Sequence, residues 1–184
     1  TLEADIVVLA TGSRPRIPEW VDVDGDRILS TRDAYPPSSV PSHAIVVGSG
    51  VTGVEFVHMF ESMGAEVTLV VSRQQVLPQK DAEVAAALEE DFLRRGVRLL
   101  KGARATSIER VGDDVVVSCD DGRVATGSHA LLAIGSIPAT GQLGLERPVA
   151  RLTAFMCPSM ISFEATWPTS MRPVISLAVS RFHR

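Results

Sequence analysis

The 184-residue sequence has little of several features that mark particular classes of protein. It holds two cysteines, too few for the disulfide framework of a small secreted domain. No apolar run approaches the roughly 20 residues needed to span a bilayer. The net charge is −4, so no positive excess points to nucleic acid or an anionic membrane. These absences favour a cytoplasmic globular protein with no nucleic-acid partner, no membrane span and no metal site.

The N-terminal segment lacks a methionine and the basic stretch of a signal peptide. Residues 5–10 predict a buried strand, which Thr11 and Gly12 break. Residues 14–41 are rich in Pro, Asp and Ser and predict a crossover or linker with one short helix near residues 31–35. A strand with no partner before it leads us to expect a chain that begins inside a domain.

The strongest pattern lies in residues 44–71. Residues 44–47 form a short β-branched run that predicts a strand, and three glycines follow with G-x-G-x-x-G spacing. Apolar residues recur at helical intervals over residues 51–63, and Gly64 is placed to stop that helix. A second β-branched run at residues 67–71 completes a predicted β-α-β unit.

Each glycine of this unit has its own physical role. Gly48 permits a tight turn, Gly50 lets a pyrophosphate approach the backbone, and Gly53 lets helix and strand pack closely. A dinucleotide would then lie over the helix N-terminus, where amides and the macrodipole favour negative charge. The predicted phosphate site therefore includes Gly48, Ser49, Gly50, Val51, Thr52 and Gly53. A glycine turn in an unrelated α/β domain is the alternative.

The residues that follow predict the rest of an α/β domain. Asp81 is placed to cap a helix with an apolar face, and Gly96 is placed to end it. Its apolar face comprises Val84, Leu88 and Phe92. A strand at 97–101 and an antiparallel meander come next, and a buried strand at 129–134 ends at Gly135. The meander strands are expected at 107–111, 114–118 and 123–125. We expect a Rossmann-like domain over residues 41–148, with a parallel sheet, helices and a small β-meander.

The tail, residues 149–184, differs from the rest of the chain. All 14 glycines precede it, and it holds one acidic residue, Glu164, against several arginines. Three prolines interrupt any periodicity. We hypothesise that this segment is read in the wrong frame, disordered or otherwise foreign to the fold. A divergent but ordered tail is the alternative.

Three motifs together resemble the two-dinucleotide-binding flavoproteins, the pyridine nucleotide-disulfide oxidoreductases that include dihydrolipoamide dehydrogenase. The first is Ala10-Thr11-Gly12-Ser13 after a strand, and the second is Gly48-x-Gly50-x-x-Gly53-x-Glu55. The third is Leu132-Ala133-Ile134-Gly135-x-x-Pro138, followed by Gly144-Leu145-Glu146. Their order and spacing also resemble actinobacterial members that act as NAD(P)H:quinone reductases.

The resemblance implies a mechanism in which NAD(P)H binds across the glycine turn and passes hydride to FAD held by a neighbouring domain. The electrons would go on to a disulfide or a quinone. It places Glu55 near the nicotinamide, and it adds Thr11, Gly12, Ile134 and Gly135 to the cofactor-binding residues. A solvated first-turn carboxylate is the alternative for Glu55. Residues 1–40 would be a remnant of the FAD-binding domain, and the family dimerises through a domain missing here.

The end of the second predicted strand decides which cofactor is preferred. An acidic residue there would bind the ribose hydroxyls of NAD, whereas an arginine would pair with the 2′-phosphate of NADP. The chain has Ser72 and Arg73 and no carboxylate at this point. We hypothesise that NADPH is accepted at least as readily as NADH, with a solvated loop arginine as the alternative.

The chain also departs from the family pattern. The redox C-x-x-x-x-C and the FAD-binding glycine motif are absent, and no histidine matches a catalytic position, so we assign no catalytic residue. Disulfide reductase and quinone reductase therefore both remain open for the parent enzyme. We expect the chain alone to bind NAD(P)H weakly and to turn over nothing. An isolated nucleotide-binding module and an inactive gene fragment are the competing interpretations.

Overall fold

The computed structural model describes residues 6–8, 10–141 and 143, with the strand backbones at 151–157, 160–166 and 174–176. At residues 6–8 it likewise describes the backbone alone. The chain divides into two compact units. One is Pro15–Gly135, and the other combines Thr1–Arg14 with Ser136–Arg184. Gly144, Leu145 and Glu146 of the third predicted motif lie outside the described residues.

The unit Pro15–Gly135 is built on a parallel sheet of five strands. The strand order is β3-β10-β4-β5-β6, with β4 in the middle. In register, Val46 of β4 lies opposite Leu69 of β5 and Leu131 of β10. The strands are β3 Ile28–Ser30, β4 His43–Val47, β5 Glu66–Val71, β6 Arg98–Lys101 and β10 His129–Leu132. Parallel pairing and two covered faces explain their nearly continuous β-branched and apolar runs.

Two helices connect the strands on one side of β4. Helix α1 is Val51–Ser62 and joins β4 to β5, and helix α2 is Ala82–Arg94 and joins β5 to β6. Gly64 and Gly96 follow the helices with φ of 91° and 87°, left-handed values that glycine adopts readily. The Asp81 carboxylate accepts hydrogen bonds from two backbone N–H groups in the first turn of α2. The stop and cap signals in the sequence are thus confirmed.

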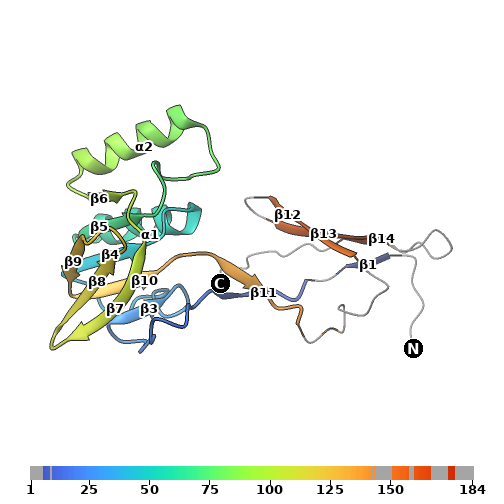
Figure 1. The fold of residues 1–184 in the computed structure, drawn as a ribbon, viewed down its shortest axis with the longest axis horizontal. Coiled ribbons are helices and arrows are strands. Elements are labelled where there is room, and N and C mark those ends of the chain that lie inside the picture. Colours follow the sequence, from blue (N-terminus) through green and yellow to red (C-terminus); the bar gives the residue numbers. More distant parts are fainter. Residues whose placement is uncertain are drawn as a thin grey trace. The chain divides into compact units, whose positions relative to one another are not determined.

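A three-stranded antiparallel meander lies between β6 and β10 in the sequence. Its strands are β7 Ala105–Val111, β8 Asp114–Cys119 and β9 Val124–Gly127, and β8 is central. Figure 1 shows the meander on one side of the parallel sheet and the two helices on the other. The predicted order of strand, helix and meander is confirmed.

Successive residues of the sheet strands pack into two different cores. Val46 and Leu69 face the helices, where they join Val57 and Phe60 of α1. Ile45 and Val70 face the meander. This alternation follows from the two-residue period of a strand, whose side chains point to opposite faces in turn. With both faces covered, the two edges of the sheet are the places where strand ends and loops meet the surface.

Predictions about this unit were wrong at three points. The short helix expected near residues 31–35 is a turn, in which Asp33 accepts hydrogen bonds from the N–H and hydroxyl of Ser30. The preceding residues form strand β3 rather than part of a linker. The apolar face of α2 is also shifted, because Val84 is 57% exposed while Ala85 and Phe92 are buried.

The other unit contains short strands from both ends of the chain. Strand β1, Ile6–Val8, pairs in parallel with β14, Val174–Ser176. Strand β13, Met160–Thr166, pairs in antiparallel fashion with β12, Arg151–Cys157, and with β14. A two-stranded sheet joins β2, Ser13–Pro15, to β11, Ser136–Pro138. The hypothesis that the tail is foreign to the fold stays a prediction.

Candidate functional site

Except for Glu55 on α1, the predicted site residues of Pro15–Gly135 gather at the carboxyl edge of the parallel sheet. The chain leaves β4 into α1 on one side, while β10 returns on the other side of β4. The strand order therefore switches direction at β4. In open α/β sheets, ligands bind outside the carboxyl ends of the strands at such a switch point. Gly48 follows β4, Ser72 follows β5 and Ala133 follows β10 at this edge.

Gly48 and Gly53 are held in contact with other parts of the backbone. Gly48 has φ of 111°, and a Cβ there would lie 2.5 Å from the carbonyl oxygen of Ala133. A Cβ at Gly53 would collide with the carbonyl oxygen of Gly48. The N–H of Gly48 also donates to the carbonyl oxygen of Val70 at 3.1 Å. The tight turn and the close packing of helix against strand, expected for these two glycines, are both present.

Gly50 differs from both of them. No described atom lies within 4 Å of a Cβ built there, and its φ of −71° is one that any residue adopts. Gly50 is exposed and is the N-cap of α1, and among the described residues no side chain caps this helix end. The first turn of α1 carries no carboxylate, so Glu55 is not the first-turn carboxylate that the sequence offered as an alternative. A helix N-terminus of this kind attracts anions through its amides and its dipole.

Ser72 and Arg73 follow β5 at the same edge. Both are exposed, and the strand they leave is fully buried from Val67 to Val71. The carbonyl oxygen of Arg73 accepts a hydrogen bond from the N–H of Gly102 at 3.0 Å, which fixes the backbone at this point. The guanidinium and the hydroxyl thus project from a strand end next to that of β4.

Ile134 and Gly135 follow β10 on the other side of β4. The N–H of Ala133 donates to the carbonyl oxygen of Val47 at 2.8 Å, so the chain after β10 runs beside the end of β4. Gly135 has φ of 102°, and its carbonyl oxygen accepts from the N–H of Arg16 at 3.0 Å. The structure therefore brings the residues after β4, β5 and β10 to one edge.

Thr11 and Gly12 belong to the other unit. Gly12 has φ of 74°, and its carbonyl oxygen accepts a hydrogen bond from the N–H of Ala139 at 2.9 Å. This bond links the two segments of that unit close to the β2–β11 pair. A cofactor contact at Thr11 and Gly12 stays a prediction.

Comparison with known proteins bears directly on this arrangement. Residues 1–151 match the family described as pyridine nucleotide-disulphide oxidoreductase. The chain belongs to this family. Its glycine turn, its β-α-β unit and its meander are thus those of a pyridine nucleotide-disulphide oxidoreductase, and the resemblance drawn from the three sequence motifs is confirmed.

Relatives in this family include proteins with different names. An NAD(P)H dehydrogenase (quinone) from Mycobacterium tuberculosis is 54% identical over 145 residues, which cover 79% of this chain and 29% of the relative. A dihydrolipoyl dehydrogenase from Zymomonas mobilis is 36% identical over 152 residues, covering 79% of this chain and 32% of the relative. The chain thus spans about a third of the length of the curated relatives it matches.

Solved structures give the same fold. The crystal structure of LpdA from Mycobacterium tuberculosis superposes with a TM-score of 0.73 at 50% identity, covering 85% of this chain and 34% of LpdA. A water-forming NADH oxidase from Lactobacillus brevis gives a TM-score of 0.68 at 24% identity, covering 85% and 35% of the two chains. The second match concerns the fold alone.

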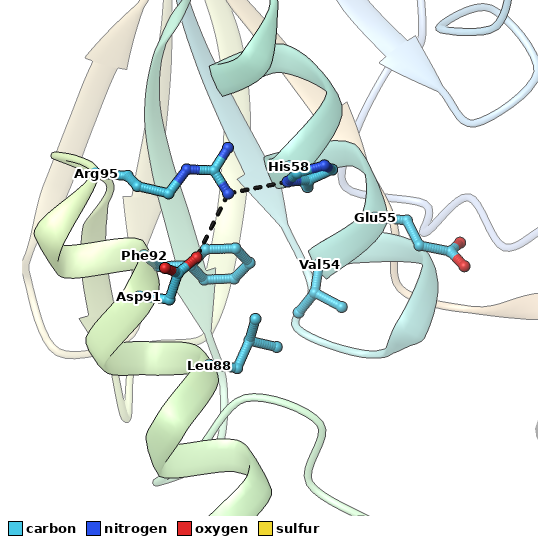
Figure 2. A pocket seen from close by; sticks show the side chains of 7 residues that line it. All are labelled: Val54, Glu55, His58, Leu88, Asp91, Phe92 and Arg95. Atoms are coloured by element: carbon cyan, nitrogen blue, oxygen red, sulfur yellow. Dashed lines mark hydrogen bonds and ion pairs between the residues drawn. The ribbon is translucent and has the colours of Figure 1, made fainter.

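Glu55 lies on the exposed side of α1. A hollow of about 320 Å³ lies between α1 and α2. It is lined by Val54, Glu55, His58, Leu88, Asp91, Phe92 and Arg95. In Figure 2 the Glu55 carboxylate points away from Arg95, which hydrogen-bonds to His58 at 2.9 Å and to Asp91 at 3.5 Å. The hollow includes none of Gly48, Gly50, Ser72 and Arg73. A nicotinamide contact at Glu55 stays a prediction.

Other candidate chemistry is sparse in the part of the chain that the structure describes. Cys119 is buried in β8, and burial raises the pKa of its thiol, so the reactive thiolate is disfavoured. No group of three or more His, Cys, Asp or Glu residues is arranged to hold a metal among these residues. Within the same residues, no helix is long and apolar enough to cross a membrane.

Sequence reasoning missed the contacts that hold residues 72–80. Glu89 of α2 accepts a hydrogen bond from the backbone of Val76, and Leu77 donates to the backbone of Ser49. A glutamate on a helix carries no sequence signal for such a role, because the partner lies 13 residues away in the chain and is a backbone group. The contact becomes visible only when α2 packs on the sheet.

Proposed function

We propose that the unit Pro15–Gly135 binds NAD(P)H at the carboxyl edge of its sheet, with the diphosphate over the glycine turn. The single observation that carries the proposal is Gly50. Gly50 is exposed, and its backbone conformation is one that any residue can adopt. No described atom lies within 4 Å of the position where a Cβ would stand. Phosphate oxygens brought close to the amides at the start of α1 would use this space.

In the longer protein, this unit would hold the nicotinamide against FAD bound by a neighbouring domain. The nicotinamide supplies the hydride when bound. The amides of the glycine turn bind and orient the diphosphate, and the buried β4 and β5 strands keep that turn rigid. Ile134 and Gly135 would border the cofactor on the β10 side. We assign no proton transfer to the glycine turn, Ile134 or Gly135, because none of these residues carries an acidic or basic side chain.

Replacement of Gly50 tests the proposal. Gly50→Val places a branched side chain in the phosphate position, and its backbone conformation remains allowed. Gly141→Val is the matched control, since Gly141 also has open space around its Cβ position and lies outside the glycine turn. We expect Gly50→Val to bind NADH and NADPH at least about tenfold more weakly, and Gly141→Val to bind as wild type does. Equal affinity in the two variants, or no binding by the wild-type chain, would overturn the proposal.

We further propose that the nucleotide preference includes NADPH. Ser72 and Arg73 are exposed after β5, where an acidic residue would instead bind ribose hydroxyls. A guanidinium forms paired hydrogen bonds with a phosphate. Arg73→Ala should weaken NADPH binding about tenfold and leave NADH binding within about twofold. Arg98→Ala is the control, because Arg98 is an exposed arginine at the start of β6. An unchanged NADPH affinity in Arg73→Ala would contradict the proposed NADPH preference.

The electron acceptor of the longer protein is proposed from its relatives. The 54% identical relative is named NAD(P)H dehydrogenase (quinone), which favours a quinone. The relatives named dihydrolipoyl dehydrogenase favour a lipoyl disulfide as the second candidate. Oxidation of NADPH by the longer protein, supplied with a quinone or with lipoamide, separates the two. For the present chain we expect no turnover. An absorbance scan that shows flavin bound to this chain would contradict the proposal that a neighbouring domain holds the FAD.

A further inference from the structure

The loop between β5 and α2, residues 72–80, is anchored to three other elements. The N–H of Gly102, after β6, donates to the carbonyl oxygen of Arg73 at 3.0 Å. The N–H of Val76 donates to Oε1 of Glu89 on α2 at 2.9 Å. The N–H of Leu77 donates to the carbonyl oxygen of Ser49 in the glycine turn at 2.7 Å. This loop therefore connects the predicted specificity position, Arg73, to the predicted phosphate position.

Glu89 is the side-chain member of these anchors. Its side chain is 12% exposed, and its second oxygen, Oε2, accepts from Nζ of Lys101 at 2.6 Å. Val76 is fully buried. A buried backbone N–H needs an acceptor, and a charged acceptor gives a hydrogen bond about twice as strong as a neutral one. Glu89 thus satisfies the amide of Val76, while Lys101 holds the carboxylate in place.

Leu77, the next residue, has an unusual backbone. Its φ is 48°, in the left-handed region that a leucine seldom adopts. Such a conformation persists only where surrounding contacts hold it. The bond from Val76 to Glu89 fixes the chain before Leu77, and the N–H of Lys80 donates to the carbonyl oxygen of Leu77 at 2.8 Å after it. In this conformation the N–H of Leu77 faces the carbonyl oxygen of Ser49.

We propose that Glu89 is a positioning residue for nucleotide binding, acting through Val76 and Leu77 on the glycine turn. The inference rests on the proposed function of the carboxyl edge. Loss of the acceptor at Glu89 would release Val76, let Leu77 leave the left-handed region and withdraw its N–H from Ser49. The glycine turn and Arg73 would then no longer be held in one arrangement, and both nucleotides would bind more weakly.

Three substitutions at Glu89 separate the effect of side-chain length from the effect of side-chain charge. Glu89→Asp keeps the charge but is one methylene too short to reach Val76, and Glu89→Ala removes the acceptor. Glu89→Gln keeps an oxygen that accepts from the amide and loses the charge. Glu90→Ala is the matched control, because Glu90 is the neighbouring exposed glutamate on α2. Dissociation constants for NADH and NADPH are measured on the full chain, together with the thermal midpoint of unfolding.

We expect Glu89→Ala and Glu89→Asp to bind both nucleotides about tenfold more weakly, and Glu89→Gln and Glu90→Ala to stay within about threefold of wild type. Glu89→Asp keeps the test decisive if Glu89→Ala fails to fold. A lower thermal midpoint with unchanged dissociation constants in both weakened variants would mean a structural role alone and would overturn the inference. So would equal weakening in Glu89→Gln. If wild type itself binds neither nucleotide, the proposed function fails as well.

Discussion

Polar groups are bonded differently at the two ends of the parallel strands, the amino edge and the carboxyl edge of the sheet. At the amino edge, Nε2 of His43 lies 2.8 Å from Oγ1 of the fully buried Thr68, and the N–H of His43 donates to Oγ of Ser128. The N–H of Ser128 returns a bond to the carbonyl oxygen of His43. At the carboxyl edge, by contrast, space is open beside Gly50 and Arg73 is exposed. The same strands thus end in one edge where these polar groups bond to one another and in another edge that leaves space open beside Gly50.

The largest expected effect is a difference in stability between substitutions at Gly53 and at Gly50. Gly53→Ala should lower the free energy of unfolding by about 3 kcal/mol or more, because its Cβ would collide with the carbonyl oxygen of Gly48. Gly50→Ala should cost no more than about 1 kcal/mol, the price of a poorer N-cap. Urea unfolding of both variants measures the difference. Similar stabilities would contradict the packing described for the glycine turn.

A smaller effect is expected at the amino edge. Thr68→Val keeps the shape of the side chain but removes the hydroxyl that pairs with His43, so stability should fall by about 1–2 kcal/mol. Nucleotide affinity should not change, because this edge lies at the opposite ends of the strands. Thr126→Val, at an exposed position on β9, serves as the control and should be nearly neutral. A loss of nucleotide binding in Thr68→Val would break the distinction between the edges.

The smallest effect is a dependence of stability on pH. Burial lowers the pKa of His43 below its usual 6.5, although nearby Glu66 opposes this, and burial with the charge of Arg27 lowers the pKa of His129. A pKa that is lower in the folded state than in the unfolded state means that the folded state binds fewer protons. Stability should therefore be greatest above pH 6.5 and fall as the pH drops below it.

Unfolding midpoints in urea at about pH 7.5 and about pH 5.5 test this dependence. In the double variant His43→Gln and His129→Gln, the decline between the two pH values should be smaller than in wild type. A decline of equal size in the variant would show that other groups are responsible. His43 and His129 at the amino edge would then not be the source of the pH dependence. The account of the carboxyl edge would not change.

Much of the fold around the candidate site was predictable because its signals are local. The β-α-β unit follows from β-branched runs, helical periodicity and glycines that stand close together in the sequence, and these residues form β4, α1 and β5 as expected. The family resemblance came from this unit together with the motifs at residues 10–13 and 132–138. Parallel pairing then brings the ends of β4, β5 and β10 to one edge without further information.

The misses have a common cause in tertiary context. Strand β3 is three residues long, and its place is set by pairing with β10, about a hundred residues later in the chain. A short helix was expected in the residues after it, yet Asp33 folds back on Ser30 to make a turn. The anchoring of residues 72–80 by Glu89 depends in the same way on how α2 packs.

The central claim is that a nucleotide occupies the carboxyl edge of this sheet and not its amino edge. Backbone amide chemical shifts of the full chain, recorded during titration with NADPH, test it most directly. We expect the amides of residues 48–53, Ser72, Arg73 and Gly135 to shift together, while those of His43, Thr68 and Ser128 stay in place. Shifts confined to the amino edge, or none at saturating NADPH, would contradict the account.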